Sequence, residues 1–351
     1  MPDFAEVGGD RTQSKVRIGV EKSLLNRRDR ARFLIVHPGL DNSFHRSRAC
    51  RIAEEFLELG LGFDSCELAR IPRGRFDLCL LFGLSEILTE GETEDARRGI
   101  ESARQISDSV LSVTAKCVHG TGFQAHLHAL RDLGIDGILD LGFAGQQEHI
   151  IRQAGLEYEF VFDGLTQRQL RESKRDDDQA DRPIPWAHVG RQTPARVGLT
   201  ARLVNHVSGQ GFAYLPSPDI VSAPLGPLQM ERILRRTQCY LWSGDDADPY
   251  LESERFWSSW QAGCLPIKIV RDDATLPDGF PFRSRIVKEE EVVERLCRLD
   301  FRAESAAFRS EYRGHPSLGD GLGRFLADRG WLDDPAERPR PLENRAYGKC
   351  A

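Results

Sequence analysis

The stretch YLESERFWSSWQAGCLPIKIV, residues 250–270, decides the fold of this chain. Apolar side chains recur in it at helical spacing, which predicts the buried face of a helix. These side chains are Phe256, Trp257, Trp260 and Cys264. Ser253 suits the N-cap of this helix, and Gly263 suits its C-terminal stop. The following LPIKIV reads as a short buried strand, so the stretch predicts one helix–strand half of an α/β unit.

The same alternation of strands and helices continues on both sides of this stretch. The strands expected before residue 166 are 32–39, 76–83, 109–118, 135–143 and 158–165. Those expected later are 186–190, 211–215, 238–244, 265–270 and 285–288. Between the two runs, residues 166–185 are charged, poor in apolar side chains and end in two prolines, which indicates a linker or a domain crossover.

The chain is therefore expected to form two Rossmann-like domains. The predicted parts are a loose N-terminal segment over 1–30, a first domain over 31–170, a linker over 171–185, a second domain over 186–332 and a tail over 333–351. A length of 351 residues suits this division, because domains of roughly 150–200 residues are a natural prior.

Composition excludes several classes of protein. A net charge of −6 argues against a nucleic-acid-binding surface. The sequence has no apolar run of the roughly 18 residues needed for a transmembrane segment, and no apolar core of a signal peptide. The eight cysteines include no C-x-x-C pair, so neither a disulfide framework nor a zinc site is expected. These features favour a protein of the reducing cytoplasm.

The start of the predicted helix carries the candidate site. No G-x-G-x-x-G or G-x-x-x-x-G-K-[ST] pattern occurs, so a dinucleotide dehydrogenase or a P-loop NTPase has little support. Arg255 and the free N–H groups of a helix N-terminus suit a diphosphate. A carboxylate at Glu252 or Glu254 could accept both hydrogen bonds of a ribose diol. The same acids could instead only complement the helix dipole, and the residues alone leave both interpretations open.

Two segments carry a family resemblance. SERFWSSWQAGCLPI resembles the nucleotide-sugar segment of exostosin-type glycosyltransferases and the corresponding segment of α1,3-fucosyltransferases. The matching residues are Tyr250, Ser253, Glu254, Arg255, Gly263, Cys264 and Pro266. PIPWAHVGRQTPARVGLTARL, residues 183–203, is similar to the opening of the C-terminal domain in CgeB-type bacterial glycosyltransferases. The close match covers roughly 40 residues, and the architecture match covers nearly the whole chain.

The resemblance implies an α/β protein of the GT-B fold, with two facing Rossmann-like domains and a donor cleft between them. It implies a glycosyltransferase of bacterial glycan biosynthesis whose donor substrate is a nucleotide diphosphate sugar, with no other cofactor. The donor-binding residues expected in the second domain are Arg191, Arg196, Tyr250, Glu252, Ser253, Glu254 and Arg255. The family pattern places a glutamate where this chain has Ser258, so Glu254 is the expected ribose ligand and Glu252 its reserve.

The first domain is expected to bind the acceptor, a glycan or another hydroxyl compound. Asp41 and His45 lie in the loop after the first strand and His119 follows a later strand, so they are the candidate general bases that take the acceptor proton. Ordinary turn and loop roles remain open for each of them. The D-x-D at 246–248 is interpreted as turn and helix-start acids, and no metal is expected.

Two other functions also stay open after the sequence analysis. Ser258 leaves room for a non-catalytic GT-B-like nucleotide-binding or scaffold protein. A nucleotide-sugar epimerase of the same fold would need no acceptor.

Overall fold

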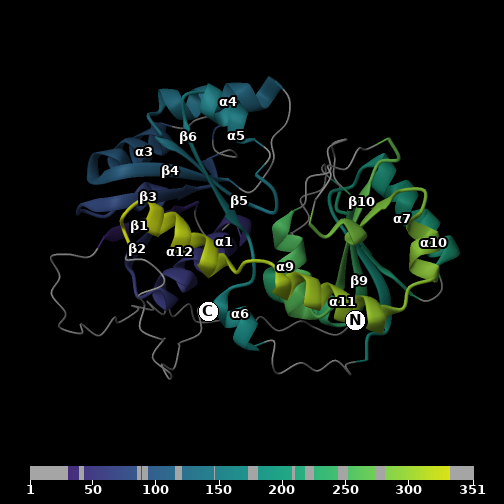
Figure 1. Cartoon of the computed structure of the whole chain (residues 1–351). Coiled ribbons are helices and arrows are strands. Elements are labelled where there is room, and N and C mark those ends of the chain that lie inside the picture. Colours follow the sequence, from purple (N-terminus) through teal and green to yellow (C-terminus); the bar gives the residue numbers. More distant parts are fainter. Residues whose placement is uncertain are drawn as a thin grey trace, which may run out of the picture. The chain divides into compact units, whose positions relative to one another are not determined.

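The first half of the chain forms a parallel sheet, as the buried strand patterns predict. The structure is a computed structural model and describes residues 31–38, 43–84, 88, 94–114, 121–145, 147–172, 181–207, 210–217, 225–243, 252–273 and 281–332. The strands of the first sheet are β1 (Arg32–His37), β2 (Gly62–Glu67), β3 (Phe76–Phe82), β4 (Ser107–Thr114), β5 (Gly137–Gly142) and β6 (Glu157–Phe162). They pair in parallel in the order β2-β1-β3-β4-β5-β6 (Figure 1). The edge strand β2 was not expected from the sequence.

Helices cover both faces of this sheet, as a parallel sheet requires. The helices of the first half are α1 (Ser43–Glu58), α3 (Glu94–Ile106), α4 (Thr121–Asp132), α5 (Glu148–Gln153) and α6 (Gln167–Glu172). One apolar core joins the sheet to α1, through Ala49, Ile52 and Phe56. A second core on the other face joins it to α3, α4 and α5 (Figure 1).

The second half forms another parallel sheet, in the order β11-β10-β9-β7-β8. Its strands are β7 (Ile184–Val189), β8 (Phe212–Tyr214), β9 (Thr237–Ser243), β10 (Leu265–Val270) and β11 (Ile286–Lys288). Its helices are α7 (Pro194–His206), α8 (Pro227–Arg235), α9 (Ser253–Ala262), α10 (Val292–Cys297) and α11 (Phe301–Gly314). Every residue of β10 is buried, which explains why LPIKIV is a continuous apolar run broken only by Lys268.

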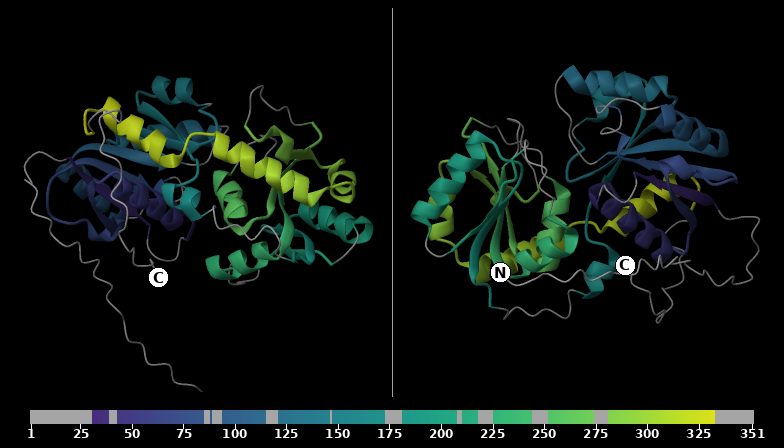
Figure 2. Two further views of the ribbon diagram at one scale, coloured as in Figure 1. Left: turned by 60° about the horizontal axis from the view of Figure 1, so that its bottom comes forward. Right: turned by 180° about the vertical axis from the view of Figure 1, so that it is seen from behind.

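The two sheets confirm the predicted α/β class with two Rossmann-like units. The chain crosses between them twice. The first crossover, which the sequence predicted as a charged linker, contains the unexpected helix α6 with a buried Gln169. In the second crossover the chain leaves α11 and continues into α12 (Leu318–Asp328) (Figure 2). Leu318, Leu322 and Phe325 of α12 belong to the core of the first sheet, so the C-terminal helix returns to the first domain.

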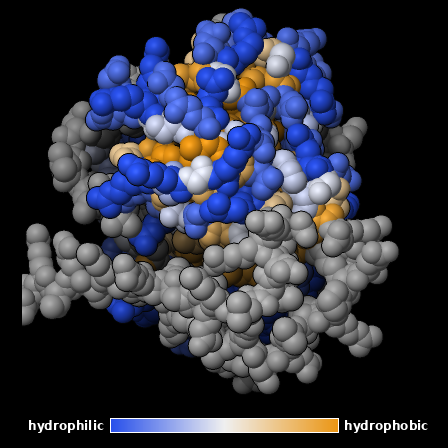
Figure 3. Space-filling model, turned by 90° about the vertical axis from the view of Figure 1, so that its left-hand side faces the viewer, coloured by the Kyte–Doolittle hydropathy of each residue, from blue (hydrophilic) through white to orange (hydrophobic). Residues whose placement is uncertain are grey.

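The surface agrees with the charged composition. Seen from the side of the first domain, it is mostly hydrophilic, with hydrophobic residues gathered in small areas between charged ones (Figure 3). In the described part of this domain, Leu57 and Phe160 are the exposed large hydrophobic side chains. No described helix combines the length and the apolar character needed to span a membrane.

Candidate functional site

Helix α9 begins at the position that the sequence predicted, but with a different cap. Glu252 is the N-cap residue and its side chain makes no capping hydrogen bond. Ser253, predicted as the cap, is the first helical residue, and its hydroxyl donates to Asp163 Oδ2 at 2.5 Å. The prediction of the cap was wrong because this hydroxyl bonds to the other domain. The first-turn N–H groups therefore have no side-chain cap.

Glu252 forms an ion pair with the buried Lys268. Lys268 Nζ lies 3.0 and 2.9 Å from the two carboxylate oxygens, and Trp242 Nε1 donates to one of them at 2.6 Å. Burial favours the neutral form of Glu252, but Lys268 and Arg255 outweigh it and lower the pKa. Each carboxylate oxygen thus already accepts a hydrogen bond, and a carboxylate can accept further ones. Glu252 therefore supports the start of α9, and its role as the reserve ribose ligand stays a prediction.

Arg255 lies beside the carboxyl end of β7. Its Nη1 donates to the Tyr240 hydroxyl and, at 3.5 Å, to the Val189 carbonyl. The guanidinium lies over the rings of Tyr240 and Trp242 at 5.4 and 5.5 Å. Within the described ranges, neither Nε nor Nη2 makes a hydrogen bond. Burial would lower the pKa of Arg255, but Tyr240, Glu252 and Glu254 raise it, so the side chain stays charged.

Arg196 has a supporting position in the same region. It is 8% exposed and donates to Ser243 Oγ at 3.2 Å, to the Ser243 carbonyl at 2.7 Å and to the Arg191 carbonyl at 2.9 Å. These bonds join the loop after β7 to the end of β9. A Cβ at Gly190 would lie 3.3 Å from Arg196 Nη1, so glycine leaves room for this close approach. The Arg191 side chain itself is exposed.

His188 completes this cluster and was missed by the sequence analysis. It is fully buried in β7, and its Nδ1 lies 2.9 Å from Thr200 Oγ1. Burial and the nearby Arg196 and Arg255 lower its pKa to about 4, so the imidazole is neutral at pH 7. The three cations Arg196, Arg255 and Lys268 lie near the two carboxylates of Glu252 and Glu254, so the cluster keeps an excess of positive charge. Such a cluster at the carboxyl ends of parallel strands suits an anion.

Gly263 has a structural reason for its place in the resembling segment. It ends α9 in the left-handed region at φ 73°, which glycine adopts without strain. A Cβ there would also lie 2.4 Å from Arg182 Nη2. Arg182 donates to carbonyls at the ends of two helices, including Ala262 at 2.8 Å and Leu234 at 3.2 Å. The glycine therefore supports the fold and need not touch a ligand.

The structure brings Glu254 together with the first domain. Burial raises its pKa, although Arg48 and Arg255 act in the opposite direction, and His45 is also close enough to contribute. Within the described ranges its carboxylate makes no hydrogen bond or ion pair. His45, one of the predicted bases, lies in α1 and is 6% exposed. The sequence-predicted donor acid and acceptor-side base are thus neighbours across the two domains.

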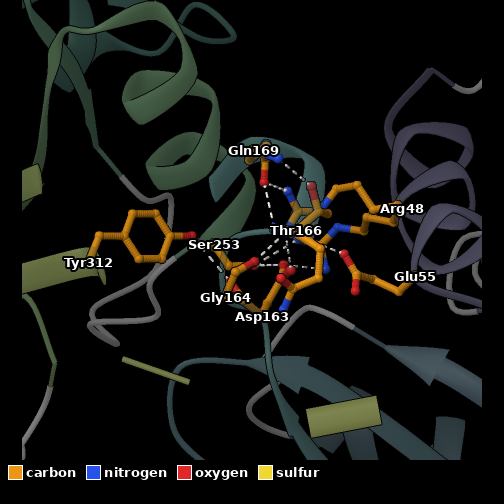
Figure 4. A network of polar contacts seen from close by, with 10 residues as sticks. Arg48, Glu55, Asp163, Gly164, Thr166, Gln169, Ser253 and Tyr312 are labelled. Carbon is orange, nitrogen blue, oxygen red and sulfur yellow. Dashed lines mark hydrogen bonds and ion pairs between the residues drawn. The ribbon is translucent and has the colours of Figure 1, made fainter. Parts of the chain in front are cut away.

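A polar network joins α1 to α9 at this point (Figure 4). Arg51 Nη2 donates to Asp163 Oδ1 at 3.0 Å, and Arg48 Nη2 donates to Ser253 Oγ at 3.3 Å. Arg51 also lies 4.5 Å from the Trp257 ring of α9. The sequence analysis missed Arg48, Arg51 and Asp163. The signal for Arg48 and Arg51 was a charged row at helical spacing in α1, beside its apolar face.

Three predicted site residues lie outside the described ranges. They are Asp41, His119 and Tyr250. The D-x-D at 246–248 also lies outside them. In the described part of the chain, no group of His, Cys, Asp and Glu side chains could hold a metal ion.

Comparisons with known proteins give structural matches only. No protein-family model matches the chain, and no curated protein matches its sequence. The glycosyltransferase SnogD from Streptomyces nogalater is 13% identical with a TM-score of 0.43, over 85% of this chain and 99% of that chain. A glycosyltransferase from Rickettsia africae is 10% identical with a TM-score of 0.47, over 87% and 100%. An α1,3-fucosyltransferase is 9% identical with a TM-score of 0.44, over 90% and 94%.

The chain is thus similar in structure to several glycosyltransferases along most of its length. All three TM-scores lie below 0.5. The GT-B-like architecture therefore rests on the two parallel Rossmann-like sheets themselves.

Proposed function

We propose that this protein is a metal-independent glycosyltransferase that moves a sugar from a nucleotide diphosphate sugar to a hydroxyl acceptor. The observation that carries the proposal is the position of Arg255. Its guanidinium lies over the rings of Tyr240 and Trp242, and its Nη1 donates to the Tyr240 hydroxyl. The other two nitrogens make no bond to a described residue, and Arg255 belongs to the first turn of α9, whose N-terminus has no side-chain cap. Both features suit a diphosphate.

In this proposal, positive charges of the second domain stabilise the leaving group. Transfer of the sugar leaves a nucleoside diphosphate, on which negative charge develops. Arg255 and the N–H groups of α9 would stabilise that charge. Arg196 and the Glu252–Lys268 pair keep the loop ends and the helix start in place. Positive side chains thus perform the task that a metal ion performs in other transferases.

The first domain supplies the acceptor side of the proposal. A general base must take the proton of the acceptor hydroxyl. His45 is the described candidate, and Asp41 and His119 remain candidates outside the described ranges. Glu254 remains the proposed ribose ligand, and Tyr250 and Arg191 remain proposed donor contacts. We also propose a cytoplasmic location, since every described cysteine is a free thiol. A role in bacterial glycan biosynthesis is proposed from the family resemblance alone.

A binding and turnover experiment tests the proposal. A ligand at about 100 times its dissociation constant should stabilise the chain by about 2.7 kcal/mol, so nucleoside diphosphates should raise Tm and nucleosides should not. Sugar-labelled nucleotide diphosphate sugars should then transfer label to a hydroxyl acceptor. Binding without transfer would indicate a non-catalytic nucleotide-binding protein. Isomerisation of the donor without acceptor would indicate an epimerase. No shift with any nucleoside diphosphate would overturn the proposal.

A further inference from the structure

Asp163 connects both domains at one point. It follows β6, the last strand of the first sheet, and is 1% exposed. Its Oδ1 accepts from Arg51 of α1 at 3.0 Å, and its Oδ2 accepts from Ser253 of α9 at 2.5 Å. Its backbone carbonyl accepts from the Tyr312 hydroxyl of α11 at 3.2 Å. One residue of the crossover therefore binds side chains from both domains (Figure 4).

Asp163 is the carboxylate that pairs with two buried arginines of α1. It lies 3.0 Å from Arg51 and 4.0 Å from Arg48. Arg48 and Arg51 are 2% and 6% exposed, so each cation needs its anion to remain buried. Removing one partner of a buried ion pair leaves an uncompensated charge, which is strongly unfavourable. The burial of both arginines therefore depends on Asp163.

The two crossovers touch at the same place. Leu318 N–H donates to the Leu165 carbonyl at 3.0 Å, and Gln167 Nε2 donates to Ser317 Oγ at 3.1 Å. A Cβ at Gly164 would lie 2.0 Å from the Pro316 carbonyl oxygen, so the two backbones are in direct contact. A rotation of one domain against the other would therefore have to change this contact and the Asp163 junction.

We propose that Asp163 is a positioning residue of the candidate site, which holds the first turn of α9 against α1 and so sets the orientation of the donor helix relative to the acceptor domain. The positioning role rests on the proposed function, but the mechanical role of the junction does not. Ser253 is the connecting group, because its hydroxyl donates to Asp163 and accepts from Arg48. Without that hydroxyl α9 loses its direct hydrogen bonds to the first domain in this network.

Ser253→Ala in the full chain tests this proposal. Fluorophores on unnatural amino acids at the exposed positions Glu101 of α3 and Arg232 of α8 report the distance between domains. We expect a broader distance distribution in the variant and a kcat about tenfold lower, because a small misplacement of reacting groups is costly. The dissociation constant of a nucleoside diphosphate and the donor KM should change less than about threefold, since the phosphate-binding groups remain. Ser259→Ala, buried on the same helix outside the network, is the matched control.

The outcomes separate this inference from the proposed function. An unchanged distance distribution in Ser253→Ala, even with a lower Tm, would show that the hydroxyl only supports stability and would overturn the inference. Asp163→Asn should broaden the distance distribution at least as much as Ser253→Ala does. If Asp163→Asn does not fold, Ser253→Ala alone decides the question. If wild type binds no nucleoside diphosphate, the proposed function fails, while the distance measurement still tests the junction.

Discussion

Ser253 Oγ and Asp163 Oδ2 lie 2.5 Å apart and join the first turn of α9 to the end of β6. The sequence placed Ser253 among the donor ligands because of its position at a helix start. In the structure the hydroxyl is fully buried and turned toward the first domain. In the proposed donor site, the phosphate-binding groups of this helix start are therefore its backbone N–H groups and Arg255. The serine contributes by fixing where those groups are.

The buried pair of Glu252 and Lys268 gives a prediction on stability. Glu252→Gln leaves the Lys268 ammonium, whose side chain is 2% exposed, without its counter-charge. We expect a loss of about 3–5 kcal/mol in the free energy of unfolding, measured by urea denaturation. The double variant with Lys268→Met should recover part of this loss. Asp95→Asn, which breaks an exposed pair with Arg98, should cost at most about 1 kcal/mol. Similar losses for the two single variants would contradict the prediction.

Arg255 gives a prediction on ligand binding. Arg255→Ala should weaken binding of a nucleoside diphosphate by about 1.5–3 kcal/mol, the range for hydrogen bonds to charged groups, and leave nucleoside binding unchanged. Calorimetry with both ligands measures the difference. Arg202→Ala removes an arginine of α7 that pairs with Glu289 and should change neither affinity. Equal losses for both ligands would show that Arg255 only packs on Tyr240 and Trp242.

Glu55 gives a prediction on pH. It is fully buried, and burial raises its pKa to about 7, although the Gln167 N–H and Arg51 act in the opposite direction. A carboxyl group whose pKa is higher in the folded state binds more protons there, so stability falls as pH rises from about 4.5 through 7. Glu55→Gln should remove this pH-dependent loss of stability. The free energy of unfolding of the variant should exceed that of wild type by about 3 kcal/mol at pH 8 and equal it near pH 4.

Urea denaturation of both proteins between pH 4 and 8 measures the effect of Glu55. Glu101→Gln, at an exposed position of α3, is the control and should leave the slope unchanged. A Glu55→Gln variant that is less stable than wild type at every pH would show that the carboxylate is needed for the Gln167 hydrogen bond.

The fold could be predicted from the sequence because its signals are local. Buried strands such as 265–270 are continuous apolar runs, and α9 ends where Gly263 adopts a positive φ. Strand β2 was missed because its GFDSCE sequence is largely polar and half exposed at a sheet edge. Helix α6 was missed because its charged residues resemble a linker. Its buried residue, Gln169, accepts a hydrogen bond from Arg51 at 2.8 Å.

The candidate site was only partly predictable for a related reason. The position of α9 and the charge of Arg255 follow from local sequence. The partners do not, because Glu252 meets Lys268 from the next strand and Ser253 meets Asp163, which is 90 residues away in the sequence. Periodicity shows which side of an element is polar, but it does not show which distant residue satisfies a polar group.

The last prediction concerns Glu254, which either accepts hydrogen bonds from the ribose or belongs to the junction with Arg48. If it binds the ribose diol, Glu254→Gln should cost about 1.5–3 kcal/mol of donor affinity. A 2′-deoxy nucleoside diphosphate should then lose a similar amount on wild type and little more on the variant, because both changes remove one interaction. Calorimetry of the four combinations measures the coupling. If the two losses add, Glu254 does not touch the ribose. Glu252, whose oxygens also bind Lys268 and Trp242, would then be the next ribose ligand to test, and Glu254 would act with Arg48 to hold the two domains together.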